Sequence, residues 1–358
     1  MACYNFNCNY DLGGVTFSCK QPADPNNDSG NKIEAETIIV PGMEEIKGAT
    51  IVGAPYIGKD YTGVFIEGRT VTLSDFYIGK YEVTQEEYES VMKNQKVTVN
   101  GKEYVLDSDP SSCTKESTNY TLFEGEEQGK RPVDSVTWYD AVWYCNALSE
   151  KEGVDPAYAI KVTSVENRTG KTGYSIKDAT VTLIEGSKGY RLPTEAEWEF
   201  AARGGDPNAE DWNYIFSGAT IPEGTSPDLN KYEILDTIAW YKYNNINGIT
   251  QQYPVTDTVA GKGSHQVGKK FANSLGLFDM TGNVMEWCYD WRGTVNAGTE
   301  TDPIDPETDP IGPDEGDARV LRGGDWFKEG YRIIVSYRWD YYPNANLYNN
   351  GFRVARSK

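Results

Sequence analysis

The sequence has little histidine, with His265 as the one residue of that type among 358. A single histidine excludes metal centres built from several imidazoles, and it leaves no basis for a Ser-His-acid catalytic set. The six cysteines form no Cys-x-x-Cys pair, and three of them fall within the first 19 residues. This pattern argues against a zinc site and against a dense disulfide framework.

Positive charge is also scarce. The chain carries 34 Lys and Arg against 54 Asp and Glu, which gives a net charge of −20. Phosphate contacts need clustered basic side chains, so we expect no nucleic-acid partner. The sequence has no run of about 18 apolar residues, which excludes a membrane-spanning helix. Hydrophobic residues still make up 38% of the chain, enough for a sizeable core.

The first 35 residues differ from the rest and are interpreted as an N-terminal extension or tether, with one domain over 36–358. Residues 21–32 hold almost no apolar side chain, as in flexible linkers. Cys19 follows a small residue and precedes this polar stretch, which resembles a bacterial lipoprotein junction. The upstream residues lack a basic start and a continuous apolar region. Cys19 is therefore either a lipidation site or an ordinary cysteine.

Three helices are predicted from capping-box patterns at residues 84–87, 137–140 and 194–197. In each, a Thr hydroxyl can accept a hydrogen bond from the first turn, and the acid three residues later can accept one from the Thr N–H. Gly153 and Gly204 are placed to end the second and third helices.

The remaining sequence predicts short strands and long loops. Residues 155–188 alternate Val, Thr, Ile and Tyr with polar residues, which indicates an inserted hairpin. Residues 296–317 are rich in Asp, Pro, Thr and Gly and predict a surface loop. Cys145 lies at helical spacing with Ala141 and Leu148, so we expect a core thiol. The absence of strand–helix alternation argues against a parallel doubly wound sheet and favours an α+β class.

Six phrases in this order resemble the formylglycine-generating enzyme (sulfatase-modifying factor) family, namely residues 76–84, 131–138, 189–203, 275–287, 321–324 and 351–355. The resemblance covers about residues 38–356. It implies an α+β domain with a divergent C-type lectin fold of formylglycine-generating-enzyme type. Such a domain has small mixed β-sheets, two to three helices and long ordered loops.

The same resemblance bears on catalysis. The oxidase chemistry of the family uses two cysteines shortly after the Arg-Gly-Gly phrase, but here Lys328 and Ile333 stand in that region, and no cysteine follows Cys288. Neither side chain can replace a soft thiolate ligand. The related sulfoxide synthases need three histidines. We therefore expect a protein that is not an enzyme and requires no cofactor.

Members that bind calcium use the segment 279–286. Carried over by position, Asp279 and Glu286 would supply carboxylate oxygens, and Gly282 and Val284 backbone carbonyls. This implies a structural calcium site. The alternative is that the two acids accept hydrogen bonds from loop N–H groups.

The segment 325–350 is unusually rich in Tyr, Trp, Asn and Arg. Tyr341 and Tyr342 are adjacent, as are Leu347 and Tyr348, so a strand could not bury all of them. Exposed residues of these types are typical of binding surfaces that recognise proteins more than sugars. The alternative is a small satellite core beneath a loop.

An Arg-Gly-Gly start, a middle rich in Asn and Tyr around Pro343, and a Gly-Phe-Arg end resemble the variable proteins of diversity-generating retroelements, the treponemal ones above all. The implied variable region is about 322–352. Lys328, Glu329 and Trp339 do not follow from adenine changes in an Asn codon. The candidate diversified, ligand-binding positions are Asp325, Phe327, Tyr331, Arg332, Ile333, Tyr337, Asp340, Tyr341, Tyr342, Asn346, Leu347 and Tyr348.

Together these features predict a non-catalytic, receptor-like or adhesin-like protein. It would be displayed on a bacterial cell surface or outer membrane, as a lipoprotein, with membrane association only through its lipid. Its ligand is not given by the sequence. The alternatives are an invariant lectin-like envelope module and an oxidase of the formylglycine-generating type.

Overall fold

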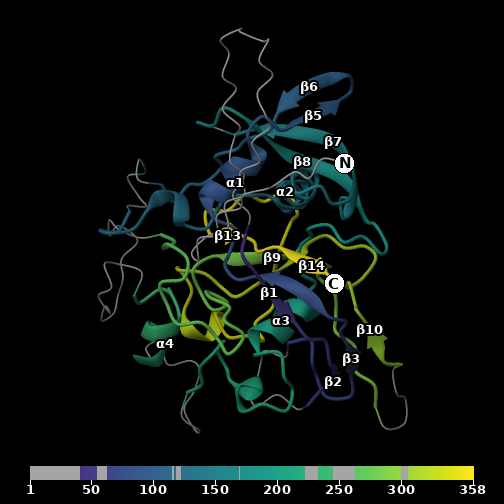
Figure 1. Ribbon diagram of the computed structural model, residues 1–358, viewed down its shortest axis with the longest axis vertical. Coiled ribbons are helices and arrows are strands. Elements are labelled where there is room, and N and C mark those ends of the chain that lie inside the picture. The colour runs from purple at the N-terminus through teal and green to yellow at the C-terminus, as the bar shows by residue number, and fades with distance from the viewer. Residues whose placement is uncertain are drawn as a thin grey trace, which may run out of the picture.

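The computed structural model describes residues 41–54, 63–114, 117, 122–168, 170–221, 233–244, 263–299 and 305–358 (Figure 1). The predicted tether, residues 1–35, and Cys19 lie outside these ranges. None of the helices in the described part is long and apolar enough to cross a membrane.

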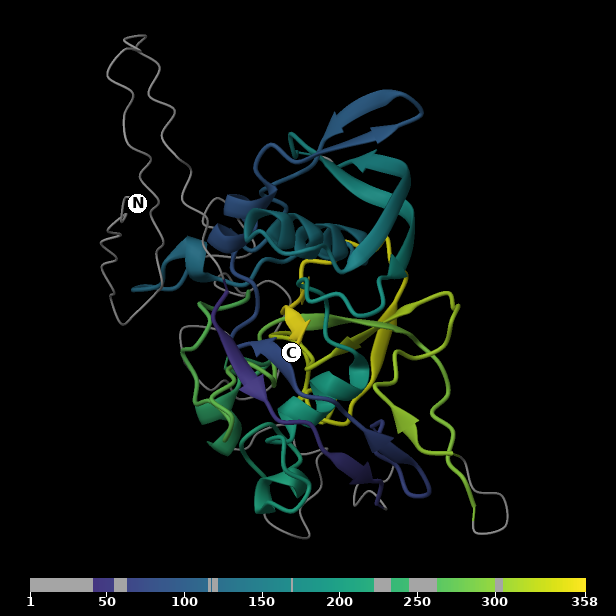
Figure 2. The ribbon, with the colours of Figure 1, turned by 45° about the vertical axis from the view of Figure 1, so that its right-hand side comes forward.

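One end of the molecule, upper in Figures 1 and 2, is built from two helices and two hairpins. The hairpin predicted within 155–188 is confirmed as an antiparallel pair with staggered apolar residues on its inner face. The elements are α1 (Gln85–Met92), α2 (Trp138–Lys151), β5 (Lys96–Val99), β6 (Lys102–Val105), β7 (Tyr158–Asn167) and β8 (Tyr174–Leu183).

The three predicted helix starts are confirmed, the third being α3 (Glu195–Ala202). At each, the Thr side chain accepts from the third-position N–H, and the third-position acid accepts from the Thr N–H. Gly153 and Gly204 follow the ends of α2 and α3 with φ of 72° and 86°, a conformation that glycine adopts without strain. A short helix that the sequence analysis missed, α4 (Glu233–Ile238), completes the set in the described residues.

Small sheets fill the centre and the other end. The first has the order β1-β4-β14 and is antiparallel throughout. The second has the order β10-β3-β2. The third has the order β12-β11-β9-β13 and is mixed, because β13 runs parallel to β9. Their bounds are β1 (Met43–Ile46), β4 (Phe76–Gly79), β14 (Ala355–Ser357), β2 (Thr50–Val52), β3 (Thr70–Thr72), β10 (Glu307–Thr308), β9 (Met285–Trp291), β11 (Arg319–Arg322), β12 (Trp339–Tyr341) and β13 (Asn350–Gly351).

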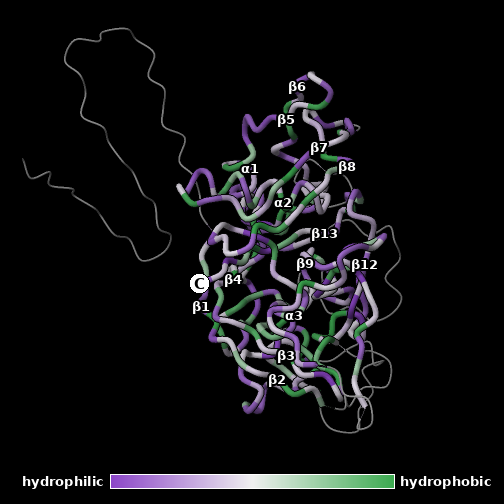
Figure 3. Tube along the Cα trace, turned by 90° about the vertical axis from the view of Figure 1, so that its right-hand side faces the viewer, coloured by the Kyte–Doolittle hydropathy of each residue, from purple (hydrophilic) through white to green (hydrophobic). Residues whose placement is uncertain are grey.

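The buried apolar residues of the described ranges form three clusters. The first contains Trp138, Trp287 and Cys145, which confirms the predicted core thiol, and the second contains Trp198 of α3. Figure 3 shows short hydrophobic stretches alternating with hydrophilic ones along the trace. The described part of the predicted loop 296–317 is mostly exposed, although β10 within it pairs with β3. The architecture confirms the α+β class.

Candidate ligand-binding surface

A double-glycine turn leads from β11 into the C-terminal segment. Gly323 and Gly324 have φ of 86° and 70°. A Cβ on Gly324 would lie 2.5 Å from Ile333 Cγ2 and 2.6 Å from Arg332 O, so the position admits no side chain. The turn therefore fixes where the segment starts and seats Ile333 against it.

Two of the twelve predicted ligand-binding positions are buried, so the prediction is wrong for them as direct contacts. Asp325 accepts hydrogen bonds from Phe327 N and Asn349 Nδ2, both at 2.7 Å. Its burial raises the pKa of this carboxyl. Ile333 packs in an apolar cluster with Leu235 and other buried residues. These side chains hold the segment in place instead of meeting a ligand.

The other ten positions are exposed or half-exposed. The Tyr342 side chain is 63% exposed, Tyr341 38% and Tyr348 37%. The satellite-core alternative is therefore wrong for these rings, and ligand contact itself stays a prediction. We call the exposed and half-exposed rings of this segment the ring surface; they belong to Phe327, Tyr331, Tyr337, Trp339, Tyr341, Tyr342 and Tyr348.

Trp339, on the edge strand β12, contacts three neighbouring side chains of the C-terminal segment. Its ring stacks on Tyr337 with centroids 5.8 Å apart and an interplanar angle of 19°. Lys328 Nζ lies 4.9 Å from its centroid, and the Arg332 guanidinium carbon lies 5.7 Å away. Trp339 and Lys328 are not among the twelve predicted positions, because neither follows from adenine changes in an Asn codon. Nothing in the sequence indicates that Lys328 and Arg332 contact the Trp339 ring, since these contacts depend on tertiary packing.

The backbone of the segment is held by the entry to α2. Trp138 N donates to Pro343 O at 2.9 Å, and Ser135 N donates to Leu347 O at 3.1 Å. Both donors belong to buried residues. The path of residues 343–347 is therefore fixed by main-chain bonds that do not depend on the identity of the neighbouring side chains.

Buried ion pairs hold the middle of the segment. Arg338 donates to both carboxylate oxygens of Glu195, at 2.6 and 2.5 Å. Arg322 pairs with Glu199 and donates to Tyr337 O at 2.6 Å. Burial pushes the pKa of Glu195 upward, but Arg338 and Arg322 outweigh it, so the pKa lies below the ordinary value. Removing one partner of such a buried ion pair is strongly destabilising, because the other charge is left buried without compensation.

Asp290 lies beside this network and accepts from Glu195 N at 2.8 Å. Burial, then the charge of Glu195, raises the pKa of Asp290 to about 8. At a pH between the ordinary pKa of an aspartate and 8, Asp290 keeps a proton in the folded protein that it has released in the unfolded chain. The contribution of Asp290 to the free energy of unfolding therefore falls as pH rises. Asp290→Asn is always neutral and retains an acceptor. We expect the Tm of this variant, relative to that of the wild type, to rise by several degrees as pH increases from 5 to 8. Parallel Tm–pH curves for the two proteins would contradict this assignment.

Tyr341 and Tyr342 contact each other edge to face, with centroids 6.0 Å apart. Because both are exposed, replacing both with Ala should change Tm by no more than about 2 °C, as for surface substitutions in general. Thermal unfolding followed by circular dichroism measures this. A loss of many degrees would show that the two rings serve as core.

The predicted calcium residues are placed in a buried cluster. Asp279 Oδ2 accepts from Gly268 N at 2.7 Å. Both oxygens of Glu286 accept from Arg353, at 2.6 and 2.7 Å, and one also accepts from Trp198 Nε1. Gly282 and Val284 lie in the turn between the two acids. The Glu286 carboxylate is paired with a guanidinium, while Asp279 Oδ1 is buried without a hydrogen-bond partner among the described residues. The calcium site at Asp279, Gly282, Val284 and Glu286 stays a prediction.

The region in which the resemblance would place catalytic thiols contains no sulfur. Lys328 is half-buried and Ile333 is buried. In the described ranges the cysteines are Cys113, Cys145 and Cys288, all of them buried and none in a disulfide. Burial raises the pKa of each thiol, which suppresses the reactive thiolate.

Comparison with known proteins places this fold. Residues 23–358 match the family described as "Sulfatase-modifying factor enzyme 1-like domain". The chain is 36% identical to the chaperone protein LppX of Paenibacillus barcinonensis over 81% of this chain and 83% of that protein. It is 29% identical to the formylglycine-generating enzyme of Thermomonospora curvata over 88% and 94% of the two chains.

Among solved structures, Treponema denticola variable protein 1 is 32% identical, with a TM-score of 0.62 over 88% of this chain and 95% of that one. The structure of CarF, at 22% identity and a TM-score of 0.55, shows likeness of fold alone. These findings confirm the predicted fold, the divergent C-type lectin fold of formylglycine-generating-enzyme type, and the likeness to the variable proteins. The chain belongs to the sulfatase-modifying factor enzyme 1-like domain family.

Proposed function

We propose that this protein is a non-catalytic, surface-displayed ligand-binding protein and that the ring surface is its binding site. One observation carries the proposal. The seven rings of the ring surface stand exposed or half-exposed, while the eighth ring of segment 325–350, that of Trp326, is buried. The backbone of the segment is fixed by the buried residues Asp325, Asn349 and Ser135. A preformed surface of Tyr and Trp offers large contact area at low entropic cost.

The chemistry of the surface favours a protein ligand. Arg332 and Lys328 flank the half-buried Trp339, while Asp340 stands exposed on the same strand. Rings combined with guanidinium and amide groups are enriched at the centres of protein–protein interfaces. A screen of this protein against the surface proteins of co-resident cells tests the proposal. Binding that survives Ala replacement of the whole ring surface would refute it.

We further propose that the ten exposed or half-exposed predicted positions are diversified by a retroelement. The likeness to Treponema denticola variable protein 1 supports this. The test lies in the DNA. A nearby repeat of the 3′ coding end, differing only at adenines and accompanied by a reverse-transcriptase gene, is the expected finding. Absence of both would leave an invariant lectin-like module.

Absence of catalysis is part of the proposal and is supported by Lys328 and Ile333 standing in place of thiols. The test is incubation of the purified protein with copper and a cysteine-containing peptide of sulfatase type. No turnover is expected. Conversion of the peptide cysteine to an aldehyde would establish an oxidase of the formylglycine-generating type instead.

Display on a bacterial cell surface or outer membrane through a lipid on Cys19 completes the proposal. The expected result is that external protease removes the protein from intact cells and that Cys19→Ser releases it into the medium. If Cys19→Ser leaves the protein on the cell, the anchor lies elsewhere.

The 36% identity to the chaperone protein LppX favours a second candidate, in which this chain assists the folding of another exported protein. Deletion of the gene separates the two. Loss of a co-expressed secreted enzyme's activity without loss of its transcript would support the chaperone role. Unchanged secreted activities together with lost ligand binding would support the first proposal.

A further inference from the structure

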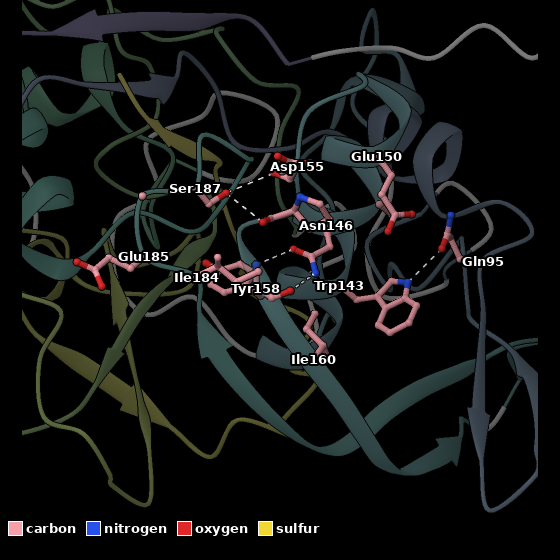
Figure 4. Close-up of a pocket in the computed structure, with 13 residues that line it drawn as sticks. Gln95, Trp143, Asn146, Glu150, Asp155, Tyr158, Ile160, Ile184, Glu185 and Ser187 are labelled. Carbon is pink, nitrogen blue, oxygen red and sulfur yellow. Dashed lines mark hydrogen bonds between the residues drawn. The ribbon is translucent and has the colours of Figure 1, made fainter.

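A second surface feature lies away from the ring surface, along α2. A groove of about 690 Å³ runs between the C-terminal half of α2, the start of β7 and the turn after β8 (Figure 4). Trp138, at the start of α2, donates its backbone N–H to Pro343 O of the C-terminal segment. At a helix rise of about 1.5 Å per residue, Asn146 lies about 12 Å further along the axis. The groove is thus separate from the proposed binding site.

Side chain–backbone hydrogen bonds fix the floor of the groove. Asn146 Nδ2 donates to Tyr158 O at 2.7 Å, and Asn146 Oδ1 accepts from Tyr158 N at 3.1 Å. On the other side, Ser187 Oγ donates to Pro156 O at 3.0 Å and accepts from Gly189 N at 3.0 Å. Figure 4 draws the bonds between Asn146 and Tyr158 and the bonds that Ser187 donates on the side of Asp155. The shape is therefore built into the fold before any ligand arrives.

The walls combine apolar surface with negative charge. Trp143 is half-buried, and its Nε1 donates to Gln95 Oε1 at 3.2 Å, which sets the ring. Ile184 is 44% exposed. Between and beyond these side chains stand three exposed acids, Glu150, Asp155 and Glu185.

No Lys, Arg or His is among the described residues that line the groove. The next basic side chain along the helix, Lys151, donates to Ser90 O at 2.7 Å. The charged side chains that line the groove are therefore all acids, in a chain with a net charge of −20.

We propose that the groove binds an extended basic segment of a partner protein, with Lys or Arg side chains at the acids and an apolar side chain between Trp143 and Ile184. In Figure 4, Glu150 and Glu185 stand on opposite sides of the view. A compact amine could meet one of them, whereas an extended peptide with alternating basic and apolar residues meets both. The Trp143 ring can in addition take a cation over its face.

The test uses the intact chain and a fluorescein-labelled peptide of sequence Lys-Leu-Lys-Leu-Lys at about 0.15 M salt, where long-range charge effects are screened within about 8 Å. The double variant Glu150→Lys/Glu185→Lys reverses the charge at both ends. The matched control is Glu89→Lys/Glu210→Lys, at two exposed acids outside the groove. Each double variant changes the net charge from −20 to −16, because each Glu→Lys step adds 2.

The groove variant is expected to bind the peptide at least about tenfold more weakly than wild type, while the control binds within about twofold of wild type. An equal loss in both variants would overturn the proposal, since it would show attraction to overall charge alone. Equal binding of Glu-Leu-Glu-Leu-Glu would also overturn it. A third contrary result is that millimolar spermidine displaces the labelled peptide completely without changing the tryptophan fluorescence of the protein. That result would show a site for small amines and would overturn the assignment of a peptide ligand.

Discussion

Replacing Arg353 with Met is expected to give the largest loss of stability of any single change considered for this protein. Arg353 is fully buried and donates to Glu286, and it also donates to Gly79 O and Phe278 O at 2.8 Å. Asp279 and Glu82 lie in the same buried cluster. Without the guanidinium, these three buried carboxyls lose the one cation that acts on all of them. The expected cost is about 3–5 kcal/mol, which lowers Tm by roughly 5–10 °C.

The matched control is Arg356→Met, three residues further along the chain on β14. Arg356 is half-exposed, donates to Lys188 O and lies over the Tyr190 ring. Its loss should change Tm by no more than about 2 °C. The pH dependence adds a second readout. Burial, partly offset by Arg353, raises the pKa of Asp279 to about 6, and loss of Arg353 should raise it further. The deficit of the Arg353→Met variant should therefore grow as pH rises from 5 to 8. A Tm equal to that of the control would contradict the assigned role of Arg353.

Trp339→Ala is expected to give the largest loss of ligand binding. Its ring contacts Tyr337, Lys328 and Arg332, so truncation removes the shared contact of the whole centre. Central Trp residues are typical binding hot spots, with losses of about 2 kcal/mol or more, which corresponds to a Kd about 30-fold higher. The measurement is titration calorimetry with the protein ligand recovered from the cell-surface screen.

Phe271→Ala provides the control, because this ring is strongly exposed and lies outside the C-terminal segment. It should leave Kd within about twofold, since isolated surface rings contribute little. A Trp339→Ala variant with wild-type Kd and wild-type Tm would show that the ligand binds elsewhere.

The sequence was sufficient where structure is local. The capping boxes at Thr84, Thr137 and Thr194 involve atoms three residues apart, so the pattern and the contact are nearly the same thing. The hairpin 158–183 follows in the same way from alternation over adjacent residues. Adjacent tyrosines at 341 and 342 likewise predicted exposed rings without any knowledge of the fold.

Prediction failed where a side chain's role depends on distant partners. Asp325 is buried because Asn349, 24 residues later, closes on it, and Ile333 is buried because Gly324 admits no side chain. Glu286 accepts hydrogen bonds from Arg353, which lies 67 residues later in the chain. No spacing rule contains these contacts. The same limit hid Trp339, whose partners meet it only after β12 pairs with β11.

We expect the buried frame alone to carry stability and the ten exposed or half-exposed predicted positions to be free to vary. The direct test is a library in which these ten positions are randomised together. The Tm of many clones is then measured. Most clones should unfold cooperatively within about 5 °C of wild type, because surface changes rarely cost more. A parallel library at the buried positions Asp325 and Ile333 should mostly fail to fold. If clones of the ten-position library fail to fold as often as clones of the buried library, the ten side chains are part of the core. That result would contradict the separation of frame and binding surface.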